Sequence, residues 1–258
     1  PIFIFDSKIL EELPKDDARV SFIHHTLQNL NTHLKTKYNS GVALYYGKPE
    51  TVFNTLINEY KVDSVYTNHD YEPEAIKRDN RVKSLLKSNG IEFKTYKDQV
   101  IFERDEIVKA DGSPYKVYTP YSKKWIDTLK IESFTILKSE DNLDKLYKSN
   151  DLPNISIQDI GFIESKLTIE QFNLNSNLID NYEATRNFPA KNGTSKISPH
   201  LRFGTISIRK TINKALKSSN NTFLKELIWR EFFMQILWHF PETVSKSFKP
   251  KYDHIKWR

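Results

Sequence analysis

The stretch Glu-Leu-Ile-Trp-Arg-Glu-Phe-Phe, residues 226–233, lies at the centre of a helix that we predict over residues 223–240. At about 100° per residue, Glu226, Trp229 and Arg230 fall on one arc of this helix. The opposite arc is an ordinary core face made of Leu224, Ile228 and Phe232. A carboxylate, an indole and a guanidinium are costly to bury without partners, and a planar aromatic ligand with hydrogen-bonding edges is one such partner. The alternative is a surface i,i+4 pair between Glu226 and Arg230 beside a Trp229 that belongs to the core.

The composition describes a globular protein with a mild preference for polyanions. Its 258 residues are 38% hydrophobic and 28% charged, which is enough chain for one large or two ordinary domains. The net charge of +6 comes from 39 basic and 33 acidic residues. Because no long apolar run is present, we expect no membrane-spanning segment. The absence of cysteine excludes disulfides and thiolate chemistry, and it fits the cytoplasmic location that we expect.

The first half alternates short apolar runs with amphipathic stretches. The runs are β-branched or aromatic, which predicts strands over residues 2–6, 42–47, 64–68 and 91–96. The stretches between them have helical spacing, which predicts helices over residues 16–38, 49–60 and 73–88. This rhythm predicts an α/β fold, a doubly wound parallel sheet, in a first domain of residues 1–130. Since neither a GxGxxG motif nor a Walker loop is present, a dinucleotide site of the usual kind is excluded.

The second half has a different pattern. Residues 131–162 are polar with few periodic positions, and we predict an interdomain connector there. Strand signals then stop, and residues 163–258 are expected to form part of an all-helical domain. Its helices are predicted over residues 167–182, 207–217 with Ser207 as N-cap, and 223–240. Two short extended segments are expected before the connector, over residues 99–102 and 106–108.

A hydroxyl-rich loop precedes one predicted helix start. Residues 193–199, Gly-Thr-Ser-Lys-Ile-Ser-Pro, combine three hydroxyls, a lysine and a turn glycine. Backbone N–H groups, hydroxyls and a helix N-terminus together favour an anion site, such as a phosphate site. Helix capping alone would explain Ser198, the expected N-cap, with Pro199 in the first turn. The residues by themselves leave both interpretations open.

Five segments of the chain carry a family resemblance. Residues 182–189, 193–204 and 226–233 resemble successive sequence blocks of the DNA photolyase/cryptochrome family, and residues 66–73 and 116–121 are similar to its N-terminal domain. The resemblance implies an α/β antenna domain followed by a helical FAD-binding domain. It points most to microbial class I photolyases, which repair cyclobutane pyrimidine dimers by light-driven electron transfer from reduced FAD to a flipped-out dimer. The family's opening strand and later helices are missing, so we expect a chain truncated at both ends and inactive alone.

The resemblance also assigns roles to residues. Those expected to contact FAD are Tyr182, Thr194, Ser195, Lys196, Ile197, Ser198, Phe223 and Arg230. Those expected to contact DNA are Arg186, Glu226, Trp229, Arg230 and Phe233. Among the expected catalytic residues, Glu226 would hydrogen-bond the dimer, Trp229 would stack on it, and Trp257 resembles the outermost tryptophan of the family's electron-transfer chain. A flipped dimer requires such an aromatic platform and an edge-reading partner.

The remaining expectations concern partners and alternatives. The resemblance implies a monomer that binds DNA containing pyrimidine dimers, with no metal and with room for a second, antenna chromophore of the folate or deazaflavin type. The alternatives are a cryptochrome photoreceptor, against which Glu226 argues, a DASH-type single-strand photolyase, and a plain α/β nucleotide-binding module. Because the family closes its flavin pocket with later helices, we expect Trp229, Phe233 and Trp238 to be partly exposed.

Overall fold

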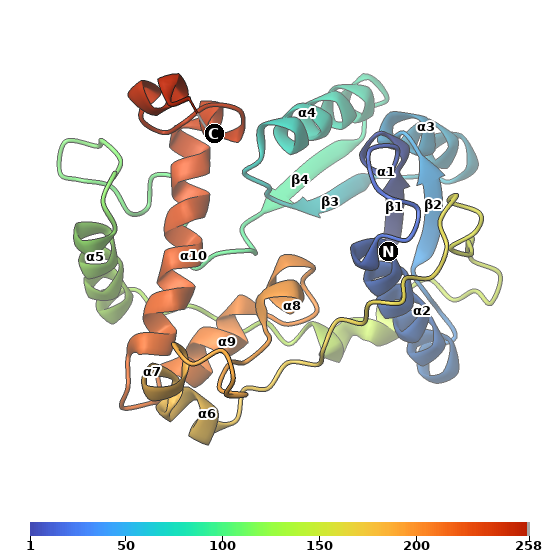
Figure 1. The fold of residues 1–258 in the computed structure, drawn as a ribbon. Helices are drawn as coiled ribbons and strands as arrows, with labels where there is room; N and C mark the ends of the chain where they lie inside the picture. Colours follow the sequence, from blue (N-terminus) through green and yellow to red (C-terminus); the bar gives the residue numbers. More distant parts are fainter. Residues whose placement is uncertain (257–258) are drawn as a thin grey trace. The chain divides into compact units, whose positions relative to one another are not determined.

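The computed structural model describes residues 1–256 and divides the chain into two compact units (Figure 1). The first unit consists of residues 1–65, 80–93 and 137–171, and the second contains residues 66–79, 94–136 and the described chain from residue 172. Each unit therefore gathers segments that are distant in sequence. The expected division at residues 131–162 differs from this arrangement.

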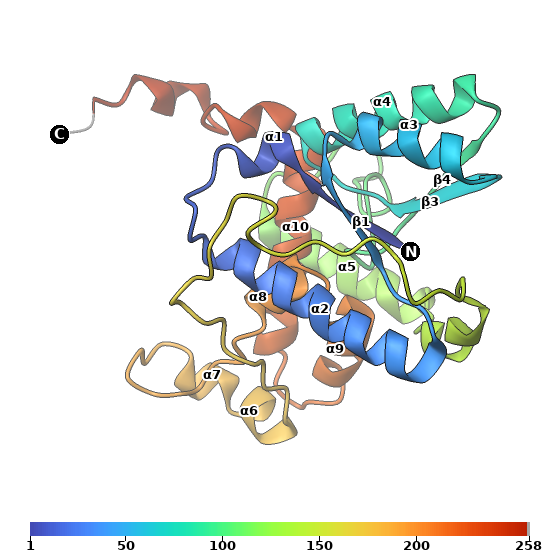
Figure 2. The same cartoon turned by 90° about the vertical axis from the view of Figure 1, so that its right-hand side faces the viewer.

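The first unit is built on a parallel strand pair. β1 (Ile2–Asp6) pairs with β2 (Ala43–Gly47), with Ile2 opposite Ala43 and Asp6 opposite Gly47. The crossover helix α2 (Ala18–Tyr38) begins where the carboxylate of Asp17 accepts the Arg19 N–H at 2.8 Å. Its Val20, Leu27 and Leu34 are buried in one cluster with Phe5 of β1 and Leu44 of β2, and Figure 2 shows the course of the helix. The short α1 (Ser7–Leu10) precedes it, and α3 (Pro49–Glu59) follows β2.

The expected connector is not a free linker. Residues 137–162 pack in the first unit, where Ile157, Ile160 and Phe162 are buried in the same cluster as Phe5 and Leu44. The Leu44 N–H also donates to the Pro153 carbonyl at 2.7 Å. Apart from the 3-10 turn η1 (Ser139–Lys145), this part of the chain has no regular element. Apolar side chains and hydrogen bonds, such as that of the Ser40 hydroxyl to the Tyr147 carbonyl at 2.8 Å, therefore hold this segment on the core.

A second strand pair follows along the chain. β3 (Ser64–Asn68) pairs with β4 (Glu92–Tyr96), and α4 (Pro73–Ser88) connects them. The Glu92 N–H donates to the Asp63 carbonyl and the His69 N–H donates to the Tyr96 carbonyl, so both strands run in one direction. The predicted α/β class is confirmed. Within residues 1–256 the strands are divided between two two-stranded sheets instead of one continuous sheet.

The second unit is mainly helical. Its helices are α5 (Tyr118–Ile131), α6 (Ser176–Asp180), α7 (Tyr182–Thr185), α8 (Ser198–Arg202), α9 (Ile208–Ala215) and α10 (Thr222–His239), followed by the 3-10 turns η2 (Pro241–Val244) and η3 (Pro250–His254). The long helix predicted over residues 223–240 is confirmed as α10. It packs against α5, where Trp125 and Tyr121 are buried with Ile228 and Phe232 (Figure 1).

One local prediction in this unit is wrong. The helix expected over residues 167–182 begins only at Ser176, because the Asn175 side chain accepts the Leu178 N–H at 2.7 Å and caps it there. The Asn173 side chain in turn accepts the Asn175 N–H at 2.9 Å, which favours a turn over a helix. The segment 99–102, expected to be extended, joins no sheet, since its buried N–H groups bond to a carboxylate of α10. The predicted N-cap Ser207 is confirmed for α9.

Candidate functional site

α10 carries the central residues of the site. Its predicted core face is confirmed, with Leu224, Ile228 and Phe232 all 5% exposed or less. The side chains of the other predicted arc, Glu226, Trp229 and Arg230, contact residues outside α10. The expected alternative, an i,i+4 pair between Glu226 and Arg230, is not formed, because each side chain bonds elsewhere.

Glu226 forms an ion pair with Arg186. The Arg186 Nη1 donates to Glu226 Oε1, and the two side chains are 33% and 36% exposed, respectively. The guanidinium also lies 5.5 Å from the ring centre of Tyr182. The hydrogen bond to Glu226 raises the pKa of Arg186. Solvent-exposed pairs of this kind contribute roughly 0.2–1 kcal/mol to stability, so the pair holds its two side chains only weakly.

Arg230 is engaged by the backbone. Its Nη1 donates to the Gln99 carbonyl at 2.6 Å and its Nη2 donates to the Leu201 carbonyl at 3.5 Å. Burial lowers the pKa of this guanidinium. Arg230 therefore ties α10 to the segment that follows β4 and to the end of α8.

Trp229 is stacked on Tyr118, the first residue of α5. The two rings are parallel to within 7° with their centres 3.6 Å apart, and the Tyr118 hydroxyl donates to the Lys225 carbonyl at 2.8 Å. Burial raises the pKa of Tyr118 to about 12. Phe233 lies 5.5 Å from Trp229 at an angle of 26° and is 61% exposed. One face of the indole is thus covered within the protein.

The partial exposure expected for three aromatic residues is confirmed. Trp229 and Trp238 are half-buried, and Phe233 is exposed. Trp238 is partly covered by the edge of Tyr71, at 6.5 Å, and by the Arg104 guanidinium, 4.6 Å from its ring centre.

Tyr182 and Phe223 pack against each other at the N-terminal end of α10. Their rings are perpendicular, with centres 5.3 Å apart. Phe223 is buried and belongs to the core of the unit, whereas Tyr182 is half-buried. Burial raises the pKa of Tyr182. Of the two expected FAD neighbours, Tyr182 is therefore the more accessible.

The hydroxyl-rich loop is held in a tight conformation. The Thr185 hydroxyl donates to the Gly193 carbonyl at 3.1 Å, and a Cβ on Gly193 would lie 2.4 Å from the Cβ of Thr185. Glycine is therefore required there. Lys196 has a φ of +55°, and the Ser195 carbonyl accepts the Asn173 N–H at 2.8 Å. These contacts shape the loop without using its hydroxyls.

The loop side chains divide into buried and accessible groups. Ser195 and Ile197 are buried, Thr194 is half-buried, and Lys196 and Ser198 are exposed. The expected capping by Ser198 is wrong, because Ile197 is the N-cap of α8 and no side chain bonds the helix start. Within residues 1–256 the Thr194 and Ser198 hydroxyls make no hydrogen bond. This donor set, with the accessible Lys196, fits a phosphate group.

Glu231 is a buried charge that the sequence reasoning missed. It is 2% exposed and accepts hydrogen bonds from the Ile101 N–H at 2.7 Å, the Phe102 N–H at 2.9 Å and the Trp125 indole at 2.5 Å. Burial raises the pKa of Glu231 to about 7, although the three donors oppose this shift. Glu231 lies three residues after Ile228 and therefore on the core arc of the helix, and this position could have indicated from the sequence that its carboxylate is buried.

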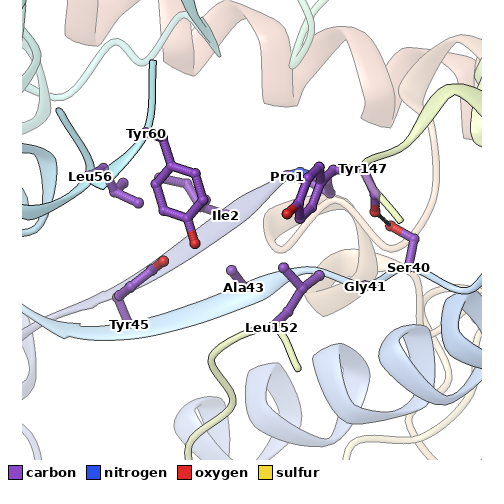
Figure 3. A pocket seen from close by; sticks show the side chains of 10 residues that line it. All are labelled: Pro1, Ile2, Ser40, Gly41, Ala43, Tyr45, Leu56, Tyr60, Tyr147 and Leu152. Atoms are coloured by element: carbon purple, nitrogen blue, oxygen red, sulfur yellow. Dashed lines mark hydrogen bonds between the residues drawn. The ribbon is translucent and has the colours of Figure 1, made fainter. Parts of the chain in front are cut away.

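The first unit contains a small apolar pocket. It lies where β1 and β2 begin, has a volume of about 180 Å³, and is lined by Pro1, Ile2, Ser40, Gly41, Ala43, Tyr45, Leu56, Tyr60, Tyr147 and Leu152 (Figure 3). Small-molecule sites usually measure about 300–1,000 Å³, so this pocket has no room for a whole antenna chromophore.

Three further observations complete the site description. No cluster of three or more His, Asp or Glu side chains placed for a metal ion occurs in the described chain. No helix within residues 1–256 has both the length and the apolar character needed to cross a membrane. Trp257, the expected outermost tryptophan of an electron-transfer chain, lies outside the described residues.

Comparisons with known proteins agree with the resemblance drawn from the motifs. A family model described as DNA photolyase matches residues 1–139, and one described as FAD binding domain of DNA photolyase matches residues 223–258. The deoxyribodipyrimidine photo-lyase of Halobacterium salinarum is 30% identical over 280 residues, which cover 100% of this chain and 57% of that protein. The chain thus spans little more than half the length of this curated relative.

Solved structures give the same picture. A bacterial class III photolyase from Agrobacterium tumefaciens superposes with a TM-score of 0.76 and 26% sequence identity. An archaeal photolyase from Sulfolobus tokodaii, solved with two FAD molecules, superposes with a TM-score of 0.70 and 27% sequence identity. Each match covers 100% of this chain and 57% of the solved chain. A cryptochrome from Synechocystis shares the fold at a TM-score of 0.76 but only 16% identity, over 94% of this chain and 56% of that one.

Proposed function

The chain belongs to the DNA photolyase family, and we propose that in its full-length protein it takes part in light-driven repair of cyclobutane pyrimidine dimers in DNA, with FAD as cofactor. The observation that carries this proposal is the accessible arc of α10. It combines the carboxylate of Glu226 with the half-buried indole of Trp229 and the exposed ring of Phe233. These are the groups that a flipped pyrimidine pair requires for edge reading and stacking.

The hydroxyl-rich loop would hold the FAD phosphates. Its support is the unused hydroxyls of Thr194 and Ser198 beside the exposed Lys196. Tyr182 would lie against the cofactor, whereas Phe223 would shape the pocket from the core. When bound and reduced, the flavin supplies the electron that splits the dimer.

The α10 residues would orient the substrate. The Glu226 carboxylate would accept hydrogen bonds from the N–H groups on the edge of the dimer and so hold it in position for electron transfer. Trp229, which is half-buried, would stack on a pyrimidine of the dimer beside the exposed ring of Phe233. Arg186 would contact a DNA phosphate. Arg230, already bound to two carbonyl groups, would contribute by fixing the position of α10.

An antenna chromophore would bind the α/β part of the full-length protein. We propose the folate and deazaflavin types. The Sulfolobus tokodaii photolyase, which holds two FAD molecules and implies a novel light-harvesting cofactor, adds FAD as a third candidate. The pocket at the start of β1 and β2, at about 180 Å³, is smaller than a usual ligand site and is not proposed as the antenna site.

The test uses the full-length protein with reduced FAD and a DNA duplex that contains one thymine dimer. Blue light should restore intact thymines, and the same mixture kept in the dark should not react. The Glu226→Gln variant should bind flavin normally but repair fewer dimers per absorbed photon, because an amide has one acceptor oxygen instead of two and holds the edge of the dimer less firmly. Absence of light-dependent repair by the parent protein, with FAD bound, would favour the photoreceptor alternative.

A further inference from the structure

Arg186 and Glu226 are each assigned to a DNA contact, yet here they bind each other. Within the described chain, Glu226 is the hydrogen-bond partner of the Arg186 side chain, and Arg186 is that of the Glu226 side chain. Both side chains are about one third exposed, so both can be reached from solvent. A ligand that binds one of these two side chains separates the pair. The other side chain then either loses its partner or must be bound by a second group of the ligand.

The elements that carry the pair are themselves well fixed. Arg186 is the C-cap of α7, where its N–H donates to the Tyr182 carbonyl at 2.9 Å, and its guanidinium lies over the Tyr182 ring. Thr185 ties this short helix to the Gly193 carbonyl. Glu226 projects from α10, whose neighbouring residues Leu227 and Ile228 are buried. Only the two side-chain ends need to move for the pair to open.

We propose that Arg186 and Glu226 form an exchangeable pair that couples phosphate binding to recognition of the damaged bases. A DNA phosphate takes over the guanidinium, and the released carboxylate accepts N–H groups from the extruded pyrimidine pair. Undamaged duplex DNA offers the phosphate but keeps its base N–H groups paired, so opening the pair would leave a lone carboxylate facing a polyanion. The exchange therefore occurs on damaged DNA. This inference rests on the function proposed above.

The coupling predicts one additional phosphate contact on damaged DNA. Each phosphate that a protein neutralises adds about 0.9 to the slope of log affinity against log salt concentration on duplex DNA. The parent protein should therefore show a slope steeper by about 0.9 for duplex with a thymine dimer than for the same undamaged duplex. Because the exchange uses the damaged bases, the difference should depend on Glu226 as well as on Arg186.

The experiment measures these slopes in the dark by fluorescence anisotropy, with the full-length protein and both duplexes. Glu226→Gln releases Arg186, so the slope for undamaged DNA should rise by about 0.9 and the affinity ratio of damaged to undamaged DNA should fall about tenfold, the effect of one charge-assisted hydrogen bond. Arg186→Gln should lower the slope for damaged DNA alone. Arg186→Lys, which keeps the charge, should retain it.

Glu183→Gln is the matched control. Glu183 lies on α7, is exposed, and accepts a hydrogen bond from Asn220 instead of Arg186. The Glu183→Gln substitution removes a negative charge from the same surface as Glu226→Gln does. The salt slopes for damaged and undamaged DNA should both stay at their parent values. The exchange would be overturned if the parent showed equal salt slopes for both duplexes and Glu226→Gln did not change them. That result would not contradict the binding of dimer-containing DNA. A parent that does not discriminate damaged from undamaged DNA would contradict the proposed function itself.

Discussion

Replacing Glu231 by glutamine tests how burial and hydrogen bonding balance in the second unit. The carboxyl group has a pKa of about 7 in the folded protein, against an ordinary value of 4.5. Between these two pH values the folded state binds a proton that the unfolded chain has lost. The free energy of unfolding therefore falls as pH rises through this window. At about 1.4 kcal/mol per pKa unit, the loss amounts to roughly 3 kcal/mol.

Glu231→Gln removes this titration and keeps the shape of the side chain. Near pH 5 the parent carries a protonated carboxyl, whose hydroxyl oxygen can still accept a hydrogen bond, whereas the amide nitrogen of glutamine only donates. The variant therefore loses at least one of the bonds from the N–H groups of Ile101, Phe102 and Trp125, and it should be less stable than the parent at this pH by about 1–3 kcal/mol. At pH 8 the parent buries a charge and the variant does not, so the difference should have shifted by about 3 kcal/mol in favour of the variant.

The measurement is denaturant unfolding of the full-length parent and variant at several pH values from 5 to 8, followed by tryptophan fluorescence. The difference between the two proteins cancels the titration of all other groups. Glu226→Gln is the control, since it makes the same substitution on the same helix at a side chain that is about one third exposed instead of buried. Parallel curves for the parent and Glu231→Gln would refute the reasoning and mean that the three donors outweigh burial.

Three further predictions concern the proposed site. Thr194→Ala combined with Ser198→Ala should lower FAD retention during dialysis, because each hydrogen bond to a charged phosphate is worth about 1.5–3 kcal/mol; equal retention would contradict the phosphate role. Trp229→Ala should weaken binding to dimer-containing DNA by roughly 1–3 kcal/mol and leave undamaged DNA unaffected, and equal losses on both would exclude stacking. Tyr118→Phe should lose the hydrogen bond to the Lys225 carbonyl, and about 1 kcal/mol of unfolding free energy, while damaged-DNA affinity stays unchanged.

Local patterns were sufficient for the elements that are amphipathic along their own length. The strands of the first half, the helices between them and α10 all agree with the predicted spans to within a few residues. In α2 and α10 the buried residues recur at helical spacing, a pattern that the sequence displays directly.

Segments held by distant contacts were not predictable in the same way. Residues 137–162 bury three apolar side chains at irregular spacing, so no periodic signal marks them as part of the first unit. The 99–102 segment resembles a strand because it is apolar, but its N–H groups are satisfied by Glu231, about 130 residues further along the chain. Such a partner becomes visible only when the chain is folded.

In the candidate site, too, the positions of residues along a helix were predictable and their distant partners were not. Helical spacing correctly placed Glu226, Trp229 and Arg230 on one arc, but it could not say which partner each would have. Arg186 lies 40 residues before Glu226, and Gln99 lies 131 residues before Arg230. The roles expected from the family resemblance remain predictions, because they concern ligands that the sequence does not contain.

The stack of Tyr118 on Trp229 determines how the substrate experiment must be interpreted. Since one indole face packs against Tyr118 at 3.6 Å, Trp229→Ala removes a stacking surface for DNA and also a contact between α5 and α10. A fall in affinity could then arise from a loosened helix pair, which would weaken binding to every DNA. The ratio of damaged to undamaged affinity separates the two causes, because loosening acts on both DNAs and stacking on only one. Tyr118→Phe supplies the complementary case, in which the ring stack is kept and only the hydroxyl contact is lost.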